Sequence, residues 1–423
     1  MIPVNKTTHH AADAILITFT LVGVFSFAVV SPLKAADDCS QGRMRTAYIN
    51  MKSVQAQLLA VQSGFMDTSV AELAQTQIRT MKDALNDAIN SFMSCQRESA
   101  ISDSSLTNRL AATLDANKPE KAPKDFPDPI PDYAVGDYGE NLQISAARAD
   151  PKLNLLAIKA SFSITCGQDT MLLIYEWRDR NWKQALRWQS DAYGEISRAF
   201  GDIFQYVILP RDPPIVAVAH GHPWCTSVWS GFDLDVIKLG SANNPQQLLL
   251  HRTEGYNRGA DEAAAMRKTA QGFELRVRDM SLDFETVFVK PVIYRYRVSD
   301  NQVRRVQPIA VNGRDFVDVW LQSKWTEASE WSSNENLDAL KNEHLKFEAQ
   351  RSSIKGSPIS SFGAVRSCSD KPNTYQVEVD QEPGGPTYYE IREGQNSFTM
   401  LWASVQPNLH CDSGDLMETR KSR

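Results

Sequence analysis

Three stretches in the middle of the chain repeat one order of apolar runs, at a spacing of about 60 residues. In each stretch, a run of alternating apolar and polar residues is preceded by one apolar run and followed, after a polar turn, by another. Alternation with a period of two is typical of strands that bury one face, so each stretch is expected to form an antiparallel meander of three or four strands. The alternating runs are 173–178, 234–239 and 292–297, the preceding runs are 155–162, 215–219 and 273–277, and the following runs are 185–188, 248–250 and 303–309.

Meanders that repeat at a fixed period suggest the blades of a propeller-like domain. A closed ring needs at least about four blades, and three units fall short of that number. Two alternatives stay open, namely a β-sandwich with a coincidental repeat and a propeller completed by strands near the C-terminus. Segments 194–200 and 259–268 are expected to insert short helices. The central region is therefore predicted to be mainly antiparallel β-sheet.

The region before the repeats has the spacing of an antiparallel helical hairpin. Apolar residues recur every three or four positions over 44–65 and again over 73–92, which lines one face of each helix. Ser69, with Glu72 three residues later, makes a capping box for the second helix. The five prolines between 117 and 139 then favour an extended linker.

After the repeats, amphipathic helices are expected over 316–331 and 337–347, with Trp320 and Trp331 as core anchors. Strand-type alternation returns near the C-terminus, at 375–379 and 388–391. The fold class predicted from these patterns is α+β with several domains. The predicted division is a signal peptide at 1–36, a helical hairpin at 37–116, a proline-rich linker at 117–139, a β-rich repeat domain at 140–312, a helical segment at 313–356 and a small β module at 357–423.

The first 36 residues indicate where the protein works. An apolar run over 14–30 follows Lys6 and ends before Pro32, Ala35 and Ala36, which is the order of regions in a secretory signal peptide. The alternative is an uncleaved membrane anchor, because the run is close to the minimum length of a spanning helix. Export to the periplasm or the extracellular space is expected, with no membrane attachment after cleavage.

The six cysteines fall two by two into the three predicted regions. In an exported chain such cysteines are expected to form disulfides. The chain contains no Cys-x-x-Cys spacing, so a metal site formed by cysteines is not expected. Nearest-neighbour pairing would place one bridge in each region, and the first would close the open end of the helical hairpin. The pairs are Cys39 with Cys95, Cys166 with Cys225, and Cys368 with Cys411.

Charge excludes one class of partner. The chain carries a net charge of −6 and has no stripe of Lys and Arg with interleaved aromatic residues. Nucleic acid is therefore not expected as a partner, and a protein or a glycan is the expected kind.

His220 and His222 are the sharpest candidates for chemistry. On a continuous strand both imidazoles would project to one side, as two ligands of a zinc or copper site do. Their third ligand would have to be a carboxylate or one of His251, His344 and His410. The alternative, which the glycine between them favours, is a pair of histidines on a loop beside a disulfide, with no cofactor.

Aromatic residues near polar turns are the second candidate group. Exported proteins often present such rings to sugars, although burial in a core explains tryptophan more often. Trp182, Trp224 and Trp229 are the predicted ligand-binding residues, and Trp182 is expected on a turn between Asn181 and Lys183.

Two functions from different classes remain. The first is an exported, non-catalytic binding or interaction protein, which the absence of every familiar nucleophile, zinc-protease and phosphate-loop motif favours. The alternative is an exported hydrolase acting on polysaccharide or cell-wall material, with His220, His222 and Asp233 or Asp235 as metal ligands or acid–base groups. No catalytic residue is assigned from sequence.

Overall fold

The described chain contains four antiparallel sheets, each of four strands. The computed structural model describes residues 42–61, 70, 72–99, 101–117, 138–150, 153–164, 167–190, 204–222, 229–240, 246–257, 264–283, 289–299, 301–307, 310, 312–353, 360–381, 384–395 and 397–417. In every sheet the strands lie side by side in chain order, so each sheet is a meander, and none of the four is closed. The fold is therefore α+β, and it shows no propeller.

The first three sheets contain the predicted strands. The first sheet is β1 (Gln143–Asp150), β2 (Leu155–Ile164), β3 (Gly167–Arg178) and β4 (Asn181–Gln189). The second is β5 (Phe204–Leu209), β6 (Ile215–Gly221), β7 (Trp229–Lys238) and β8 (Gln247–Asn257). The third is β9 (Ala265–Lys268), β10 (Gly272–Met280), β11 (Val289–Ser299) and β12 (Gln302–Val306).

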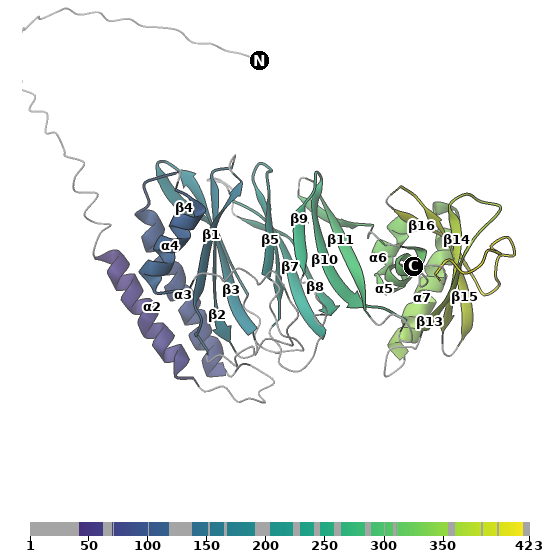
Figure 1. Cartoon of the computed structure of the whole chain (residues 1–423), viewed down its shortest axis with the longest axis horizontal. Helices are drawn as coiled ribbons and strands as arrows, with labels where there is room; N and C mark the ends of the chain where they lie inside the picture. The colour runs from purple at the N-terminus through teal and green to yellow at the C-terminus, as the bar shows by residue number, and fades with distance from the viewer. Residues whose placement is uncertain are drawn as a thin grey trace, which may run out of the picture.

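These three sheets stand face to face, and the second sheet lies between the others (Figure 1). Alternate residues of β6 point to opposite sides, so Val216 and Val218 pack toward the first sheet while Ala217 and Ala219 pack toward the third. Every residue of β6 is buried as a result. Burial on both faces explains why this run is almost wholly apolar.

Helices cover the outer face of the first sheet. They are α2 (Arg43–Leu59), α3 (Glu72–Ser94) and α4 (Asp103–Leu114), and they share one apolar core with β1, β2 and β3. The two predicted helices are confirmed, and α4 is an addition to them. Leu73, which was expected on the buried stripe of the second helix, is 63% exposed, so that assignment is wrong. The buried stripe of α3 instead begins at Ala74.

The fourth sheet and its helices form what we call the C-terminal module (Figure 1). The sheet is β13 (Ser360–Ser367), β14 (Thr374–Gln381), β15 (Gly385–Glu393) and β16 (Phe398–Ser404), and the helices are α5 (Gly313–Gln322), α6 (Trp325–Ala328) and α7 (Leu337–Ser353), with short 3₁₀ turns at Ser329–Trp331 and Asn334–Asn336. Trp320 and Trp331 are buried in the core of this module, as predicted.

The helix expected over 316–331 is interrupted. Ser323 and Lys324 have extended backbone angles, so α5 ends before α6 begins. The interruption folds the chain back over Trp320, whose indole donates hydrogen bonds to the Ala328 carbonyl and the Ser332 hydroxyl. One continuous helix could not bring these groups together, because residues 8 and 12 positions apart would lie about 12 and 18 Å apart along its axis.

Of the remaining expectations, one helix is wrong, one disulfide is confirmed, and several segments lie outside the described residues. Ala265–Lys268, expected in a helix, forms strand β9 and pairs with β10, which overrides the helix propensity of its alanine-rich surroundings. The disulfide between Cys368 and Cys411 is confirmed. Cys39, Cys166, Cys225, the leader, residues 118–137 of the linker, segment 194–200 and Ser69 lie outside the described residues. In the described part, no helix is long and apolar enough to cross a membrane.

Candidate functional site

His220 lies at the end of β6 and is buried between the first and second sheets. Its ring centroid is 5.4 Å from that of Trp188 and 6.2 Å from that of Phe204. Burial lowers the pKa of His220 to about 3, so the imidazole is neutral at ordinary pH. A neutral ring held between two aromatic rings is typical of a packed core position.

The other predicted histidine pairs with a carboxylate. Nε2 of His222 lies 2.9 Å from Oδ2 of Asp233, and the Thr253 hydroxyl donates a 2.7 Å hydrogen bond to Oδ1 of the same carboxylate. Burial alone would raise the pKa of Asp233, but the hydrogen bonds from His222 and Thr253 hold it below its usual range. Gly231 makes this possible, because a Cβ atom there would lie 2.8 Å from the His222 ring.

A second pair lies beside the first on the same face of β7. Nδ1 of His251 lies 2.8 Å from Oδ1 of Asp235, and the Trp188 indole donates a 2.7 Å hydrogen bond to Oδ2. The hydrogen bond to Asp235 raises the pKa of His251. Strand register explains the arrangement, because Asp233 and Asp235 are two positions apart and His251 is the cross-strand partner of Asp235.

We call the two pairs, His222 with Asp233 and His251 with Asp235, the His–Asp row. Within the described residues this row does not form a metal site. Each of the two carboxylates is held by one histidine and one neutral donor, and no group of three His, Cys, Asp or Glu in the described ranges is arranged to hold a metal ion. Its hydrogen bonds instead join strands, and through Trp188 they join two sheets. The geometry is that of a structural polar layer.

Trp182 does not lie on an exposed turn. The left-handed residues Asp179 and Arg180 make the turn, and β4 has already begun at Asn181. The Trp182 ring is 5% exposed, contacts Trp177 edge-on at 5.3 Å, and donates a hydrogen bond to the Glu98 carbonyl. It therefore offers no free face to a ligand. Trp224 and the side chain of Trp229 lie outside the described part of the chain.

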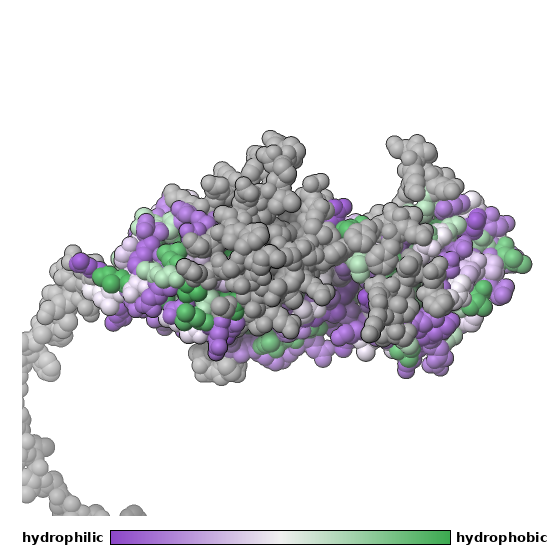
Figure 2. Space-filling model, turned by 90° about the horizontal axis from the view of Figure 1, so that it is seen from below, coloured by the Kyte–Doolittle hydropathy of each residue, from purple (hydrophilic) through white to green (hydrophobic). Residues whose placement is uncertain are grey.

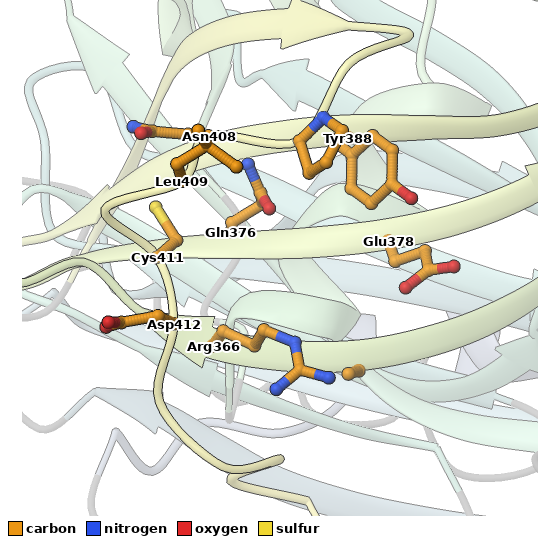
Figure 3. Close-up of a pocket in the computed structure, with 10 residues that line it drawn as sticks. Arg366, Gln376, Glu378, Tyr388, Asn408, Leu409, Cys411 and Asp412 are labelled. Carbon is orange, nitrogen blue, oxygen red and sulfur yellow. The ribbon is translucent and has the colours of Figure 1, made fainter.

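A pocket opens on the outer face of the fourth sheet, where sequence reasoning placed no site (Figure 3). Its cavity volume is about 290 Å³. This is close to the lower end of the roughly 300–1,000 Å³ typical of small-molecule sites. The lining comes from β13, β14, β15 and the segment after β16: Ala364, Arg366, Gln376, Glu378, Tyr388, Pro407, Asn408, Leu409, Cys411 and Asp412.

Strand alternation builds the floor of this pocket. On β14, Val377 and Val379 face the core of the module, so Gln376 and Glu378 face outward. Tyr388 is the cross-strand partner of Glu378 and joins them on that face. A register shift in β13 places Gly363 under Glu378, where a Cβ atom would lie 2.9 Å from the carboxyl carbon. The glycine thus lets the Glu378 side chain lie close over β13.

The segment after β16 forms the wall, and several bonds hold it against the sheet. The disulfide joins Cys411 to Cys368 at the end of β13, and the Ser369 amide donates to the His410 carbonyl at 2.8 Å. The Asn408 amide donates a 2.8 Å hydrogen bond to Glu390 on β15. The wall is therefore fixed by covalent and polar contacts together.

One buried polar group in the pocket lacks a protein partner. Gln376 is 4% exposed, and its amide points into the pocket without a hydrogen bond to any described residue (Figure 3). Its amide atoms are not among the fully buried, unpartnered side-chain atoms of the described residues, so solvent reaches them through the pocket. Native proteins keep such groups mostly where a water or a ligand completes them.

The remaining polar groups carry both signs of charge. Arg366 donates a 2.6 Å hydrogen bond to the Ser413 carbonyl, which fixes its guanidinium beside the pocket. Burial and the nearby Glu378 raise the pKa of Tyr388, so its hydroxyl stays protonated and can both donate and accept. Such a lining can bind a polar molecule through many hydrogen bonds.

The sequence held only a weak signal of this pocket. Outward polar residues on strands, such as Gln376 and Glu378, are ordinary for a solvated sheet face. The more informative signal was Pro407-Asn408-Leu409 close before Cys411, which places an apolar loop next to a cysteine. Comparison with protein-family models and with curated proteins found no match to this chain.

Proposed function

We propose that this chain is an exported, non-catalytic binding protein that holds its ligand in the pocket of the C-terminal module. The observation that carries the proposal is the Gln376 amide, which points into the pocket and makes no hydrogen bond to the described protein. A ligand in the pocket would meet there a donor and an acceptor that no described residue occupies.

A binding function fits the structure better than hydrolysis, because the predicted acid–base groups are buried or already hydrogen-bonded. His220 is buried and neutral, and Asp233 and Asp235 already accept hydrogen bonds from neighbouring strands. A general base needs free access to the proton that it removes. Structural partners occupy the side chains that the hydrolase alternative would use.

The rest of the chain is proposed as a scaffold. The three central sheets each form a meander in chain order, as the fourth sheet does. The ion pair of Arg252 on β8 with Glu327 on α6 connects this scaffold to the C-terminal module. The disulfide between Cys368 and Cys411 is compatible with an oxidising compartment outside the cytoplasm.

The test is a thermal-shift screen of the full chain under oxidising conditions. A ligand present at 100 times its Kd should stabilise the protein by about 2.7 kcal/mol. The screen is run in parallel on wild type, on Tyr388→Ala in the pocket, and on Arg392→Ala, an exposed residue of the same strand that does not line the pocket. A shift in wild type and Arg392→Ala that disappears in Tyr388→Ala supports the proposal. Hits that shift all three proteins equally would place binding elsewhere.

A further inference from the structure

Resting on the proposed function, we infer that the pocket binds an uncharged, hydroxyl-rich ring, namely one sugar unit of a neutral glycan. Three features of the lining carry the inference: its mixed charge, its planar polar side chains, and its aromatic and apolar side chains. Each feature restricts the chemistry of the occupant.

Charge is the first feature. Arg366 stands against Glu378 and Asp412, so the pocket has one cationic and two anionic side chains. An anionic ligand would meet two carboxylates, and a cationic ligand would meet the guanidinium. Either would be repelled at one side of a small pocket, because like charges at close range disfavour binding. An uncharged ligand avoids both conflicts.

The shape of the polar groups is the second feature. Gln376, Glu378 and Arg366 all end in planar groups with two or more heteroatoms, while the Asn408 amide is already bound to Glu390. Such groups can bind two neighbouring hydroxyls of a ring at once, as bidentate pairs do. Hydroxyls both donate and accept, so they suit a lining that mixes an amide, a carboxylate and a guanidinium. The unpartnered Gln376 amide is the member that gains most.

The aromatic and apolar side chains of the lining are the third feature. Tyr388, Pro407, Leu409 and Ala364 line the pocket together with the polar groups (Figure 3). A sugar ring has apolar C–H faces as well as hydroxyl edges, so it requires both kinds of lining. Tyr388 supplies a rigid ring with a polar tip, which is suited to such mixed contacts.

The surroundings indicate a unit within a longer glycan. Leu409 is 85% exposed at the pocket, and Trp402 and Val405 are also exposed nearby in sequence. Trp402 is the cross-strand partner of Glu390, and Tyr388 lies two residues along from Glu390, so both rings are on the outer face of the sheet. Apolar residues also appear on the surface of this module, at the right of Figure 2. Further sugar units could leave the open pocket across this face.

The experiment measures affinity of the full chain by calorimetry for two matched series of probes. The neutral series is oligomers of glucose, xylose, mannose and N-acetylglucosamine. The charged series is cationic chitosan oligomers, anionic oligogalacturonates and zwitterionic amino acids. Chitosan and N-acetylglucosamine oligomers share one backbone, so this pair isolates the effect of charge.

We expect at least one neutral oligomer to bind, and its affinity to fall at least tenfold in both Gln376→Leu and Tyr388→Ala. Arg392→Ala should change it less than twofold. Tyr388 is partly exposed, so its variant should fold even if replacing the buried Gln376 does not. Tyr388→Phe, which keeps the ring, should retain more affinity than Tyr388→Ala.

Other outcomes separate the two proposals. A charged or zwitterionic probe that binds and loses affinity in the pocket variants, with no neutral oligomer binding, would overturn the ligand class and leave the binding function intact. Neutral oligomers that bind the pocket variants as tightly as wild type would overturn the glycan site in this pocket. Failure of every probe, together with a negative thermal-shift screen, would overturn both proposals.

Discussion

The indole of Trp188 on β4 donates a 2.7 Å hydrogen bond to the carboxylate of Asp235 on β7, and so joins two different sheets. The same carboxylate accepts from His251 on β8, within the second sheet. Most of the surrounding contact between these sheets is apolar and non-directional. This hydrogen bond is therefore a directional element that fixes how the first sheet sits on the second.

Replacing Trp188 with Phe tests this role. The substitution keeps an aromatic ring beside His220 and removes only the indole donor and part of the volume. Hydrogen bonds to charged groups contribute about 1.5–3 kcal/mol, so a loss of that size in the free energy of unfolding is expected. Urea denaturation followed by circular dichroism measures it. Trp402→Phe, at an exposed position, is the control and should change stability by less than about 0.5 kcal/mol. Equal effects of the two substitutions would refute the role.

His220 makes the protein sensitive to acid. Its pKa in the folded protein is about 3, mainly because burial disfavours the imidazolium. In the unfolded chain a histidine has a pKa near 6.5, so below that pH the unfolded chain binds a proton that the folded protein does not bind. Stability should therefore fall as pH drops from about 6.5 toward 3. At pH 5 the loss from this group is about 2 kcal/mol.

His220→Phe should remove that pH dependence, because phenylalanine fills a similar space and does not titrate. The measurement is the difference in unfolding free energy between pH 7.5 and pH 5, compared with wild type. The comparison cancels other groups, including His251, whose raised pKa acts in the opposite direction by favouring the folded state at low pH. His410→Gln, at an exposed position, is the control. A variant that keeps the full wild-type pH dependence would contradict the prediction.

The ion pair of Lys82 and Asp169 anchors α3 to β3. The two charged atoms are 3.1 Å apart, and both side chains are fully buried. Lys82→Met leaves the carboxylate in the core without its cation, so we expect a loss of about 3–5 kcal/mol in unfolding free energy. The double variant Lys82→Met with Asp169→Leu should recover much of that loss, since no charge then stays buried. A single variant within about 1 kcal/mol of wild type would show that the pair does not hold the helix in place.

Local patterns predicted the strands because burial alternates along strands such as β11 and is continuous along strands such as β6, and each pattern leaves its own apolar run in the sequence. The runs around 173–178, 234–239 and 292–297 lie in β3, β7 and β11. Strand β9 replaces the expected helix because pairing with β10 determines its structure, and composition does not report pairing. Helix α4 had a local signal that went unused: Ser102 caps it by accepting a hydrogen bond from the Ser105 amide.

The candidate site could not be predicted in the same way. The sequence did group His220 and His222 with Asp233 and Asp235, and the structure brings these residues together. Their role in joining two sheets depends on Trp188. This residue comes from another sheet and reaches Asp235 only through sheet packing. The Gln376 amide is likewise an ordinary outward strand residue until the segment ending at Cys411 covers it. Contacts between distant segments determine both outcomes.

The disulfide between Cys368 and Cys411 should control the pocket as well as stability. It closes a loop over a sequence separation of 43 residues, for which chain entropy gives about 4 kcal/mol of stabilisation. Because Cys411 lines the pocket, releasing it also frees the wall that covers Gln376. The double variant Cys368→Ser with Cys411→Ser should therefore lose unfolding free energy and bind the pocket ligand at least tenfold more weakly, even at temperatures where circular dichroism shows it folded. Adding a reductant to wild type should reproduce the loss of affinity and leave the affinity of the double variant for the pocket ligand unchanged. Full affinity in the folded double variant would show that the polar contacts of Asn408 and Ser369 hold the wall without the covalent bond.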